Sequence, residues 1–370
     1  MGAKGAIASA GANGRPNCID ARITQLVTEV LRVDPANPEK ELIARAAECL
    51  RAGGLVAFPT ETVYGLGAHA LDRAAILRVF AAKERPANDP LIVHVTALDD
   101  AVPLVEDLPS VARELAARFW PGPLTMVLKR STVVPDEVTA GLQTVAIRVP
   151  SHPVARALLE GARIPVAAPS ANLFSRPSPT RAAHVVADLN GRIDMIVDGG
   201  PTDVGLESTV IDLSGAMPMV LRPGAIDLDA LRQVLPDVTS RQAAAADTAA
   251  MPSPGMLAKH YSPKTPVVLH QGDRATALGL MTRDAQRRVA SGETVVVLSY
   301  TEDVSQLRDL GARIVELAAE ASPAAVAARL YAAFRECDEL GAGVILVRSI
   351  TTSHPLSGAI QDRLRRAAAR

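Results

Sequence analysis

Apolar and polar positions repeat with two different periods along this chain, and the two patterns together predict alternating helices and strands. Residues 55–58 are apolar without alternation, which is typical of a strand covered on both faces. Residues 144–149 alternate and predict a half-buried strand, whereas 38–51 and 73–83 have apolar side chains at helical spacing. We expect Asp72, Ser110, Ser151 and Thr180 to cap helices, and further strands at 91–95, 125–129, 195–197 and 208–213.

Predicted strands lie next to one another in pairs as well as between helices, so we expect an α/β fold with a twisted sheet of mixed direction. The composition changes near residue 236, where a segment rich in Ala, Ser, Pro and Thr loses its apolar period. Three more apolar runs follow it, separated by Ala-rich helices, and they predict a smaller Rossmann-like α/β domain. The expected divisions are a poorly structured extension (1–36), a first domain (37–235), a linker (236–264) and the second domain (265–370).

Composition excludes several classes of protein. The 370 residues carry a net charge of −1, so no overall field favours nucleic acid or acidic lipid. The three cysteines lie far apart with no CxxC pair, which fits a reduced cytoplasm and argues against a disulfide framework or a thiolate zinc site. No apolar run approaches the roughly 20 residues of a membrane span, so we expect no contact with membranes.

The stretch 53–68, GGLVAFPTETVYGLGA, combines a buried strand with polar side chains and two glycines. A simple polar turn with a buried tyrosine would explain it as well as a binding loop would. Gly65, Gly67 and Ala70 also match the GxGxxA dinucleotide pattern, but six residues separate Phe58 from Gly65, so a nicotinamide site is a weak hypothesis. The chain has no P-loop, no GxSxG elbow and no His/Asp/Glu cluster with metal-ligand spacing.

Basic and hydroxyl residues recur at strand ends and in Gly/Pro turns. Arg148 and Arg222 end predicted strands before a proline, where a guanidinium can bind two oxygens of a carboxylate or phosphate. Each could equally form a salt bridge at the rim of the sheet, Lys83 and Arg85 could be solvated, and His94 could be a buried core residue. As a set they suggest a site that orients a polyphosphate and a second anion by position and charge.

Several motifs in order make the chain resemble the YrdC/Sua5 family of L-threonylcarbamoyladenylate synthases. They are PTETVYGLG, PLIVH after a Lys-x-Arg-Pro segment, WPGPLT, TVAIRVP, APSAN, ESTVID and LRPG, between about residues 39 and 224. SPGMLAKHYSP at 253–263 and the domain after it resemble the long, Sua5-type branch. The resemblance implies a YrdC-like first domain that joins L-threonine, bicarbonate and ATP into threonylcarbamoyl-AMP with release of pyrophosphate. This is the first step of t6A modification of tRNA.

The resemblance also implies roles for individual residues, with Mg²⁺ entering together with ATP. Lys83, Arg85 and Arg148 would be catalytic. Threonine would contact Thr62, His94, Arg148, Ala168 and Ser208; ATP would contact Lys83, Arg85, Asp89, Thr144, Ser170, Asn172, Ser178, Arg222 and Tyr261. Asp89 departs from the asparagine frequent in the family, and a carboxylate there would repel phosphate unless Mg²⁺ or Lys83 offsets it.

Two further expectations concern partners and the linker. Proteins that modify tRNA would take up the product, and weak direct contact with tRNA is possible. The main alternative is an RNA-binding module without adenylate-forming activity, whose affinity would fall steeply with salt. His260 and Tyr261 lie between turn-forming residues in a featureless tether, so we expect this segment to close over the site rather than act as a spacer. Tyr261 could instead pack only on the second domain.

Overall fold

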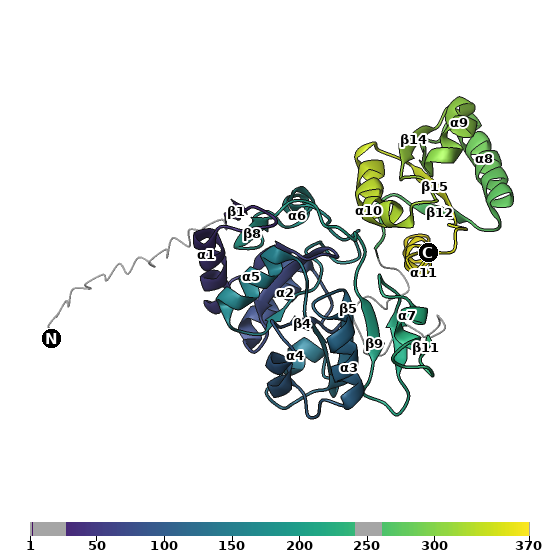
Figure 1. Ribbon diagram of the computed structural model, residues 1–370. Helices are drawn as coiled ribbons and strands as arrows, with labels where there is room; N and C mark the ends of the chain where they lie inside the picture. Colours follow the sequence, from purple (N-terminus) through teal and green to yellow (C-terminus); the bar gives the residue numbers. More distant parts are fainter. Residues whose placement is uncertain (1, 3–26, 241–260, 370) are drawn as a thin grey trace.

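A computed structural model describes residues 2, 27–240 and 261–369, and these residues build two α/β domains (Figure 1). The first domain holds an 11-stranded sheet and the second a 4-stranded sheet. No helix in the described part of the chain combines the length and apolar character that a membrane span needs.

The large sheet mixes parallel and antiparallel neighbours, as the paired strands of the sequence predicted. Its spatial order is β1-β8-β2-β3-β7-β4-β6-β5-β9-β10-β11. The strands are β1 (Glu29–Arg32), β2 (Val56–Pro59), β3 (Tyr64–His69), β4 (Ile92–His94), β5 (Leu124–Lys129), β6 (Thr144–Arg148), β7 (Val166–Ala167), β8 (Met195–Asp198), β9 (Thr209–Asp212), β10 (Met219–Arg222) and β11 (Thr239–Ser240).

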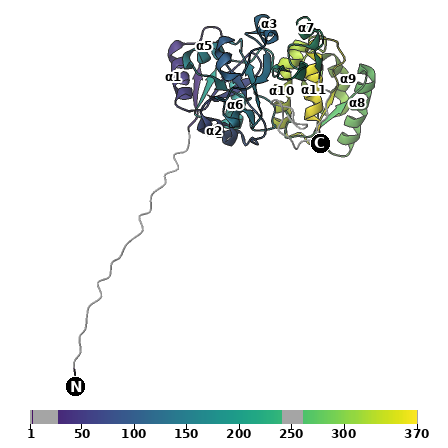
Figure 2. The same cartoon turned by 90° about the horizontal axis from the view of Figure 1, so that it is seen from below.

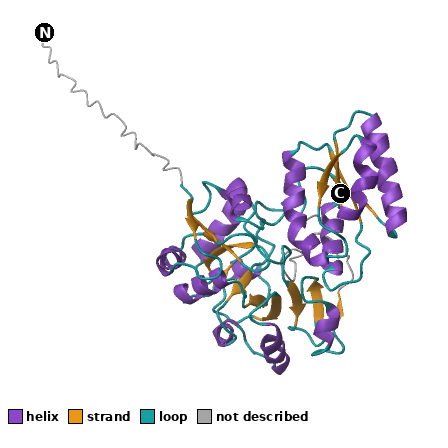
Figure 3. Cartoon of the chain, turned by 45° about the horizontal axis from the view of Figure 1, so that its top comes forward, coloured by secondary structure: helices purple, strands orange, loops and turns teal. Residues whose placement is uncertain are grey.

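Helices cover both faces of this sheet (Figure 3). Helices α1 (Lys40–Arg51) and α5 (Pro153–Ala162) pack on one face through one apolar cluster. The other face carries α2 (Arg73–Lys83), α3 (Ser110–Phe119), α4 (Asp136–Thr139) and α6 (Ala182–Leu189), which share the largest apolar cluster. A short helix, α7 (Leu228–Arg232), lies next to the β9–β11 end.

The stretch 53–68 is a hairpin, not the strand and loop that its pattern predicted. β2 pairs antiparallel with β3. Position 67 within β3 requires glycine, because an added Cβ would stand 2.8 Å from the Phe58 ring. Neither glycine begins a helix, so the nicotinamide interpretation is wrong. β3 in turn supports the Pro169–Asn172 loop, since Leu66 N donates to Pro169 O at 2.7 Å and Ala171 N to Tyr64 O at 2.8 Å.

Helix caps were predicted correctly only in part. The Asp72 carboxylate accepts from Ala74 N and Ala75 N at the start of α2, as expected. Ser110 is the first helical residue rather than a cap, and His152 and Arg181, not Ser151 and Thr180, precede α5 and α6. β6 is almost wholly buried rather than half-buried, since four of its five residues are buried.

The second domain has a fully parallel sheet in the order β12-β15-β13-β14, in agreement with the predicted Rossmann-like pattern. Helices α10 and α11 cover the face turned to the first domain, and α8 covers the far face (Figure 2). The elements are β12 (Val267–His270), α8 (Arg274–Ala290), β13 (Val295–Ser299), α9 (Val304–Leu307), β14 (Arg313–Glu316), α10 (Pro323–Glu339), β15 (Val344–Arg348) and α11 (Ser357–Ala367).

Two of the expected divisions need correction at their ends. β1 lies inside the segment 1–36 that was expected to be poorly structured, and it pairs with β8 as part of the first domain. β11 lies inside the expected linker 236–264, yet it pairs with β10. The rest of the extension and linker, 3–26 and 241–260 with His260, lies outside the described residues, so the remaining domain limits stay predictions.

Candidate active site

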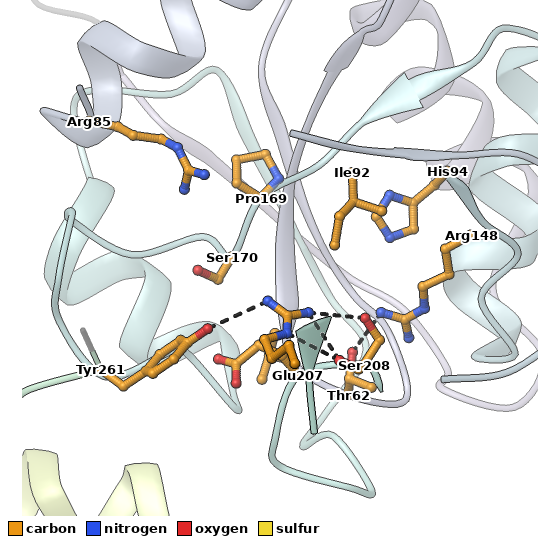
Figure 4. Close-up of a pocket in the computed structure, with 12 residues that line it drawn as sticks. Thr62, Arg85, Ile92, His94, Arg148, Pro169, Ser170, Glu207, Ser208 and Tyr261 are labelled. Carbon is orange, nitrogen blue, oxygen red and sulfur yellow. Dashed lines mark hydrogen bonds between the residues drawn. The ribbon is translucent and has the colours of Figure 1, made fainter. Parts of the chain in front are cut away.

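A cavity opens where β4, β6, β9 and β10 meet the Pro169–Asn172 loop and the start of the second domain (Figure 4). Residues from eight predicted site positions line it: Thr62, Arg85, His94, Arg148, Ser170, Ser208, Arg222 and Tyr261. The fold therefore brings together side chains that are up to 199 positions apart, from Thr62 to Tyr261.

Arg148 is the anchor of one end of the cavity. It ends β6, is only 4 % exposed, and donates from one terminal nitrogen to Thr62 Oγ1 at 3.0 Å. Its other terminal nitrogen lies 2.8 Å from Glu61 Oε1 in a buried ion pair. Burial raises the pKa of Glu61, but the charge of Arg148 and its hydrogen bond outweigh burial and hold that pKa below its ordinary value. The Glu61 carboxyl is therefore ionised at neutral pH.

His94 stands beside Arg148, since the two residues are paired in register between β4 and β6. Burial, and next the positive charge of Arg148, lower the pKa of His94 to about 3. The imidazole is therefore neutral throughout the physiological range. Its Nδ1 is buried and has no hydrogen-bond partner among the described residues, so it is available to a bound molecule.

Ser208 lies beside Thr62 at the same end of the cavity, and Arg222 continues the wall towards Tyr261 (Figure 4). Arg222 ends β10 and its guanidinium donates to both Ser208 O and Ser208 Oγ at 3.1 Å. The Ser208 hydroxyl also lies 2.8 Å from Thr125 Oγ1. The serine hydroxyl thus has a fixed orientation, as a binding site that selects by hydrogen bonding requires.

A third charged group consists of Arg85 and Asp89, the carboxylate that was expected to repel phosphate. Arg85 NH2 lies 2.9 Å from Asp89 Oδ2, and both side chains are buried. The Asp89 carboxylate is thus offset by an ion pair with Arg85, whereas the sequence had suggested Mg²⁺ or Lys83 for this role. Lys83 instead donates to the main-chain oxygens of Ser170 and Asn172, the latter at 2.6 Å, and fixes the Pro169–Asn172 loop.

Six predicted site residues do not line the cavity. They are Lys83, Asp89, Thr144, Ala168, Asn172 and Ser178. Lys83, Asn172 and Ser178 bond to loops that form the wall, the last through Glu207 Oε1 at 2.5 Å. Thr144 begins β6, about 13 Å from Arg148 at the usual rise of a strand. Their predicted roles stay predictions.

Sequence analysis missed two acidic residues that the site depends on. Glu61 pairs with Arg148, and Glu207 lines the cavity and pairs with Arg363 of the second domain at 2.8 Å. Each glutamate directly precedes a predicted hydroxyl contact, Thr62 or Ser208. This adjacency was the only sign in the sequence that the two glutamates lie at the site. A carboxylate is not expected to bind anionic substrates, so neither was predicted as a site residue.

Tyr261 links the cavity to the second domain. It is 1 % exposed, and its hydroxyl lies 3.5 Å from Arg222 NH1 (Figure 4). Its ring lies 5.8 Å from the ring of Tyr331 on α10. Tyr261 thus lines the cavity and also packs on the second domain, so the alternative that it packs only on the second domain is wrong. Closure of the segment over the site stays a prediction, because its part up to His260 lies outside the described residues.

Comparisons with known proteins identify the family. Residues 48–224 match the YrdC/YciO/Sua5 domain family, described as "Telomere recombination", and residues 226–369 match the "Threonylcarbamoyl-AMP synthase, C-terminal domain" family. Threonylcarbamoyl-AMP synthase of Pyrococcus abyssi is 42% identical over 89% of this chain and 94% of its own length. The chain belongs to the threonylcarbamoyl-AMP synthase family.

Other members of the family support the same assignment. The Bacillus subtilis threonylcarbamoyl-AMP synthase is 40% identical over 88% of this chain and 92% of its own length. A crystal structure of P. abyssi Sua5 complexed with L-threonine superposes with a TM-score of 0.85 at 40% identity, covering 92% of this chain and 98% of that one. E. coli YciO, at 28% identity and a TM-score of 0.50, matches 55% of this chain over its whole length. The chain is therefore an enzyme of nucleotidyltransferase type and has the two-domain form.

Proposed function

We propose that this chain synthesises threonylcarbamoyl-AMP from L-threonine, bicarbonate and ATP, with release of pyrophosphate, for the t6A modification of tRNA. The observation that carries the proposal is the cavity itself. A forked cation, two oriented hydroxyls and a neutral imidazole converge at one end of it, and two further arginines line the rest. The P. abyssi relative crystallised with L-threonine supports the choice of amino acid.

The threonine subsite is assigned to the end formed by Thr62, His94, Arg148 and Ser208. Arg148 binds the substrate carboxylate, because a guanidinium already held by Glu61 can present its fork without reorganisation. The hydroxyls of Thr62 and Ser208 bind the threonine hydroxyl. His94 and the main chain near Ala168 complete the wall, and the neutral imidazole adds no charge that would repel the substrate amine.

The nucleotide subsite runs from Arg85 and Arg222 along the sheet towards Thr144. Ile92 of β4 also lines the cavity, and it packs with Val127, Ala146, Val210 and Leu221 in a buried apolar cluster of the sheet. An apolar side chain at this place suits a flat base. We assign Ser170 to the nucleotide subsite because it lines the cavity. Asn172 and Ser178 act on the same subsite indirectly, through hydrogen bonds that fix the neighbouring loops.

Mg²⁺ fits this site as an ion that arrives with ATP. The described residues contain no group of three or more His, Cys, Asp or Glu side chains placed to hold a metal, and Glu61, Asp89 and Glu207 each contact an arginine. Phosphate oxygens and water would therefore hold it, as is usual for Mg²⁺ on nucleotides. When bound, Mg²⁺ supplies charge neutralisation on the phosphates.

The chemistry needs positioned groups rather than a protein nucleophile. The threonine amine adds to bicarbonate with loss of water, or to CO₂ derived from it with loss of a proton, to form a carbamate. A carbamate oxygen then attacks the α-phosphorus of ATP and pyrophosphate leaves. Arg85 and Arg222 offset charge that develops on the phosphates, and a charged hydrogen bond contributes roughly 1.5–3 kcal/mol. Enclosure by Tyr261 limits the water that could hydrolyse the labile carbamate.

The product would pass to proteins that modify tRNA in the cytoplasm, and weak contact with tRNA itself is part of the proposal. An RNA-binding module without the reaction is not favoured, because the family assignment rests on both domains.

A pyrophosphate-release assay with each of the twenty amino acids and with 2-aminobutyrate, with and without bicarbonate, tests the function. Release should require threonine and bicarbonate together. Serine should be a poor substrate and 2-aminobutyrate a far worse one, because the buried hydroxyls of Thr62 and Ser208 lose their partner with it. Release that ignores threonine or bicarbonate, or equal use of 2-aminobutyrate, would contradict the proposal.

A further inference from the structure

One arginine of the second domain contacts two residues that line the cavity, Glu207 and Tyr261, and the main chain next to a third, Arg222. Arg363 on α11 is fully buried, and its Nε lies 2.8 Å from Glu207 Oε2. Its NH2 donates to Pro223 O at 3.2 Å, the residue next to Arg222. Its guanidinium carbon lies 4.9 Å from the centre of the Tyr261 ring, a cation–π distance.

Glu207 is the centre of this arrangement. It lines the cavity and directly precedes Ser208, and its carboxylate also accepts from the hydroxyls of Tyr331 at 2.9 Å and Ser178 at 2.5 Å. Burial raises the pKa of Glu207, but Arg363 and then Arg222 outweigh burial and keep that pKa below its ordinary value. A buried negative charge therefore stands in the wall of a cavity that takes anions, and Arg363 is its closest cation.

The two domains are also in close apolar contact at this point. Gly205 has a φ of +75°, and an added Cβ would lie 2.4 Å from the main chain of Ala328 on α10. Leu206 and Val63, the neighbours of Glu207 and Thr62, belong to the apolar cluster of the second domain. The Thr62 and Ser208 segments thus rest on that domain.

We propose that Arg363 is a positioning residue for the reaction: from the second domain it fixes Glu207, the Arg222–Pro223 turn and Tyr261, and neutralises the carboxylate beside the substrates. The proposal rests on the proposed function, since it assumes that anionic substrates occupy the cavity. Without Arg363 the Glu207 carboxylate repels them and the Ser208 segment loses its fixed position.

The test compares Arg363→Gln, Arg363→Lys and the double variant Glu207→Gln/Arg363→Gln in the full chain. Arg335→Gln is the matched control, because Arg335 is a buried α10 residue that pairs with Asp188 of the first domain at 2.6 Å, and Asp188, unlike Glu207, does not line the cavity. L-Threonine and ATP affinities are measured by calorimetry, and turnover by pyrophosphate release across pH.

Arg363→Gln should weaken threonine binding at least tenfold, Arg363→Lys should weaken it less, and Arg335→Gln should change it less than threefold. The double variant should recover at least half of the loss on a logarithmic scale, because it removes the unpaired carboxylate. The pH optimum of turnover in Arg363→Gln should also shift to lower pH, where Glu207 is protonated. Damage to folding alone would not produce this shift.

Equal effects of Arg363→Gln and Arg335→Gln, or no recovery in the double variant, would overturn the positioning role. If Arg363→Gln does not fold, the comparison of Arg363→Lys with Arg335→Gln decides in the same way. Failure of the proposed function is distinguishable, because the unsubstituted chain would then release no pyrophosphate in response to threonine and bicarbonate.

Discussion

The guanidinium of Arg148 is held in place within the cavity before an anionic substrate binds. Its guanidinium contacts Glu61 and Thr62 within a buried cluster, so its orientation is set before substrate arrives. Arg148→Ala should abolish turnover, and Arg148→Lys should restore little, because an ammonium cannot bind both oxygens of a carboxylate in the same plane. Threonine affinity, measured by calorimetry, should fall at least tenfold in both variants.

Arg45→Ala is a suitable control for this prediction, since Arg45 forms an exposed pair with Glu29 and should contribute little. Breaking a buried pair also costs stability, about 3–5 kcal/mol when one partner is removed. Affinity must therefore be measured at a temperature at which each variant is folded. Near-native threonine affinity in Arg148→Lys would refute the bidentate role.

His94 gives a prediction about stability and pH. Its pKa of about 3 lies below the ordinary 6.5, so between these values the unfolded chain binds a proton that the folded chain does not. Stability should thus fall as pH is lowered through this window, by up to about 1.4 kcal/mol per pH unit from His94. His94→Asn should show a shallower loss between pH 6.5 and 5 in urea unfolding.

The difference between the two proteins is the informative quantity, because His152 and His184 also have lowered pKa values and remain in both. Identical slopes for the two proteins would show that His94 is protonated in the folded state. The neutral imidazole would then be wrong, and with it the proposed wall of the threonine subsite.

Single residues of the site were predictable from sequence where a motif fixed both identity and place. Arg148 and Arg222 stood out because each ends a strand before a proline, whereas Thr62 and Ser208 followed from the family resemblance; all four line the cavity. The partners were not predictable: Glu61 and Glu207 needed the distances to Arg148 and Arg363, which lie far away in the chain. Nor could the sequence distinguish side chains that face the cavity from those, such as Lys83, that fix its loops.

At the scale of elements, the β2–β3 hairpin positions Thr62 at its turn and supports the Pro169–Asn172 loop. Gly67→Ala should therefore cost about 1–3 kcal/mol of stability, because the new methyl group would stand 2.8 Å from the Phe58 ring and 3.0 Å from Val166. Gly215→Ala is the control, since an added Cβ there meets nothing within 4 Å, and it should change stability by less than about 0.5 kcal/mol. Denaturant unfolding of both variants checks this, and equal stabilities would contradict the packing argument.

The elements with a strong period were predictable, and short or tightly packed ones were not. α2 with its Asp72 cap and β2 follow from local pattern alone. β3 was missed because its two glycines suggested a loop. They instead leave room for neighbours that are distant in the sequence, Ala168 beside Gly65 and Val166 beside Gly67, where the Phe58 ring also lies. β1 and β11 consist of a few residues each and depend on pairing with β8 and β10.

For the whole molecule, the contacts between the domains make the second domain part of the site. A chain that ends at Ser240 should keep its first-domain sheet, which includes β11, but lose Tyr261, Tyr331 and Arg363. Threonine-dependent pyrophosphate release should then fall at least tenfold, while circular dichroism still shows a folded α/β domain. A truncated chain with the rate and coupling of the full chain would show that the second domain has no part in the reaction.

The central claim is that one cavity joins threonine, bicarbonate and ATP into a single product. It is tested most directly by mass spectrometry of the nucleotide formed with L-threonine, ATP and ¹³C-labelled bicarbonate. The account predicts a threonylcarbamoyl-AMP that carries the labelled carbon, with one pyrophosphate released for each product molecule. AMP alone, or a threonine adenylate that lacks the labelled carbon, would contradict it.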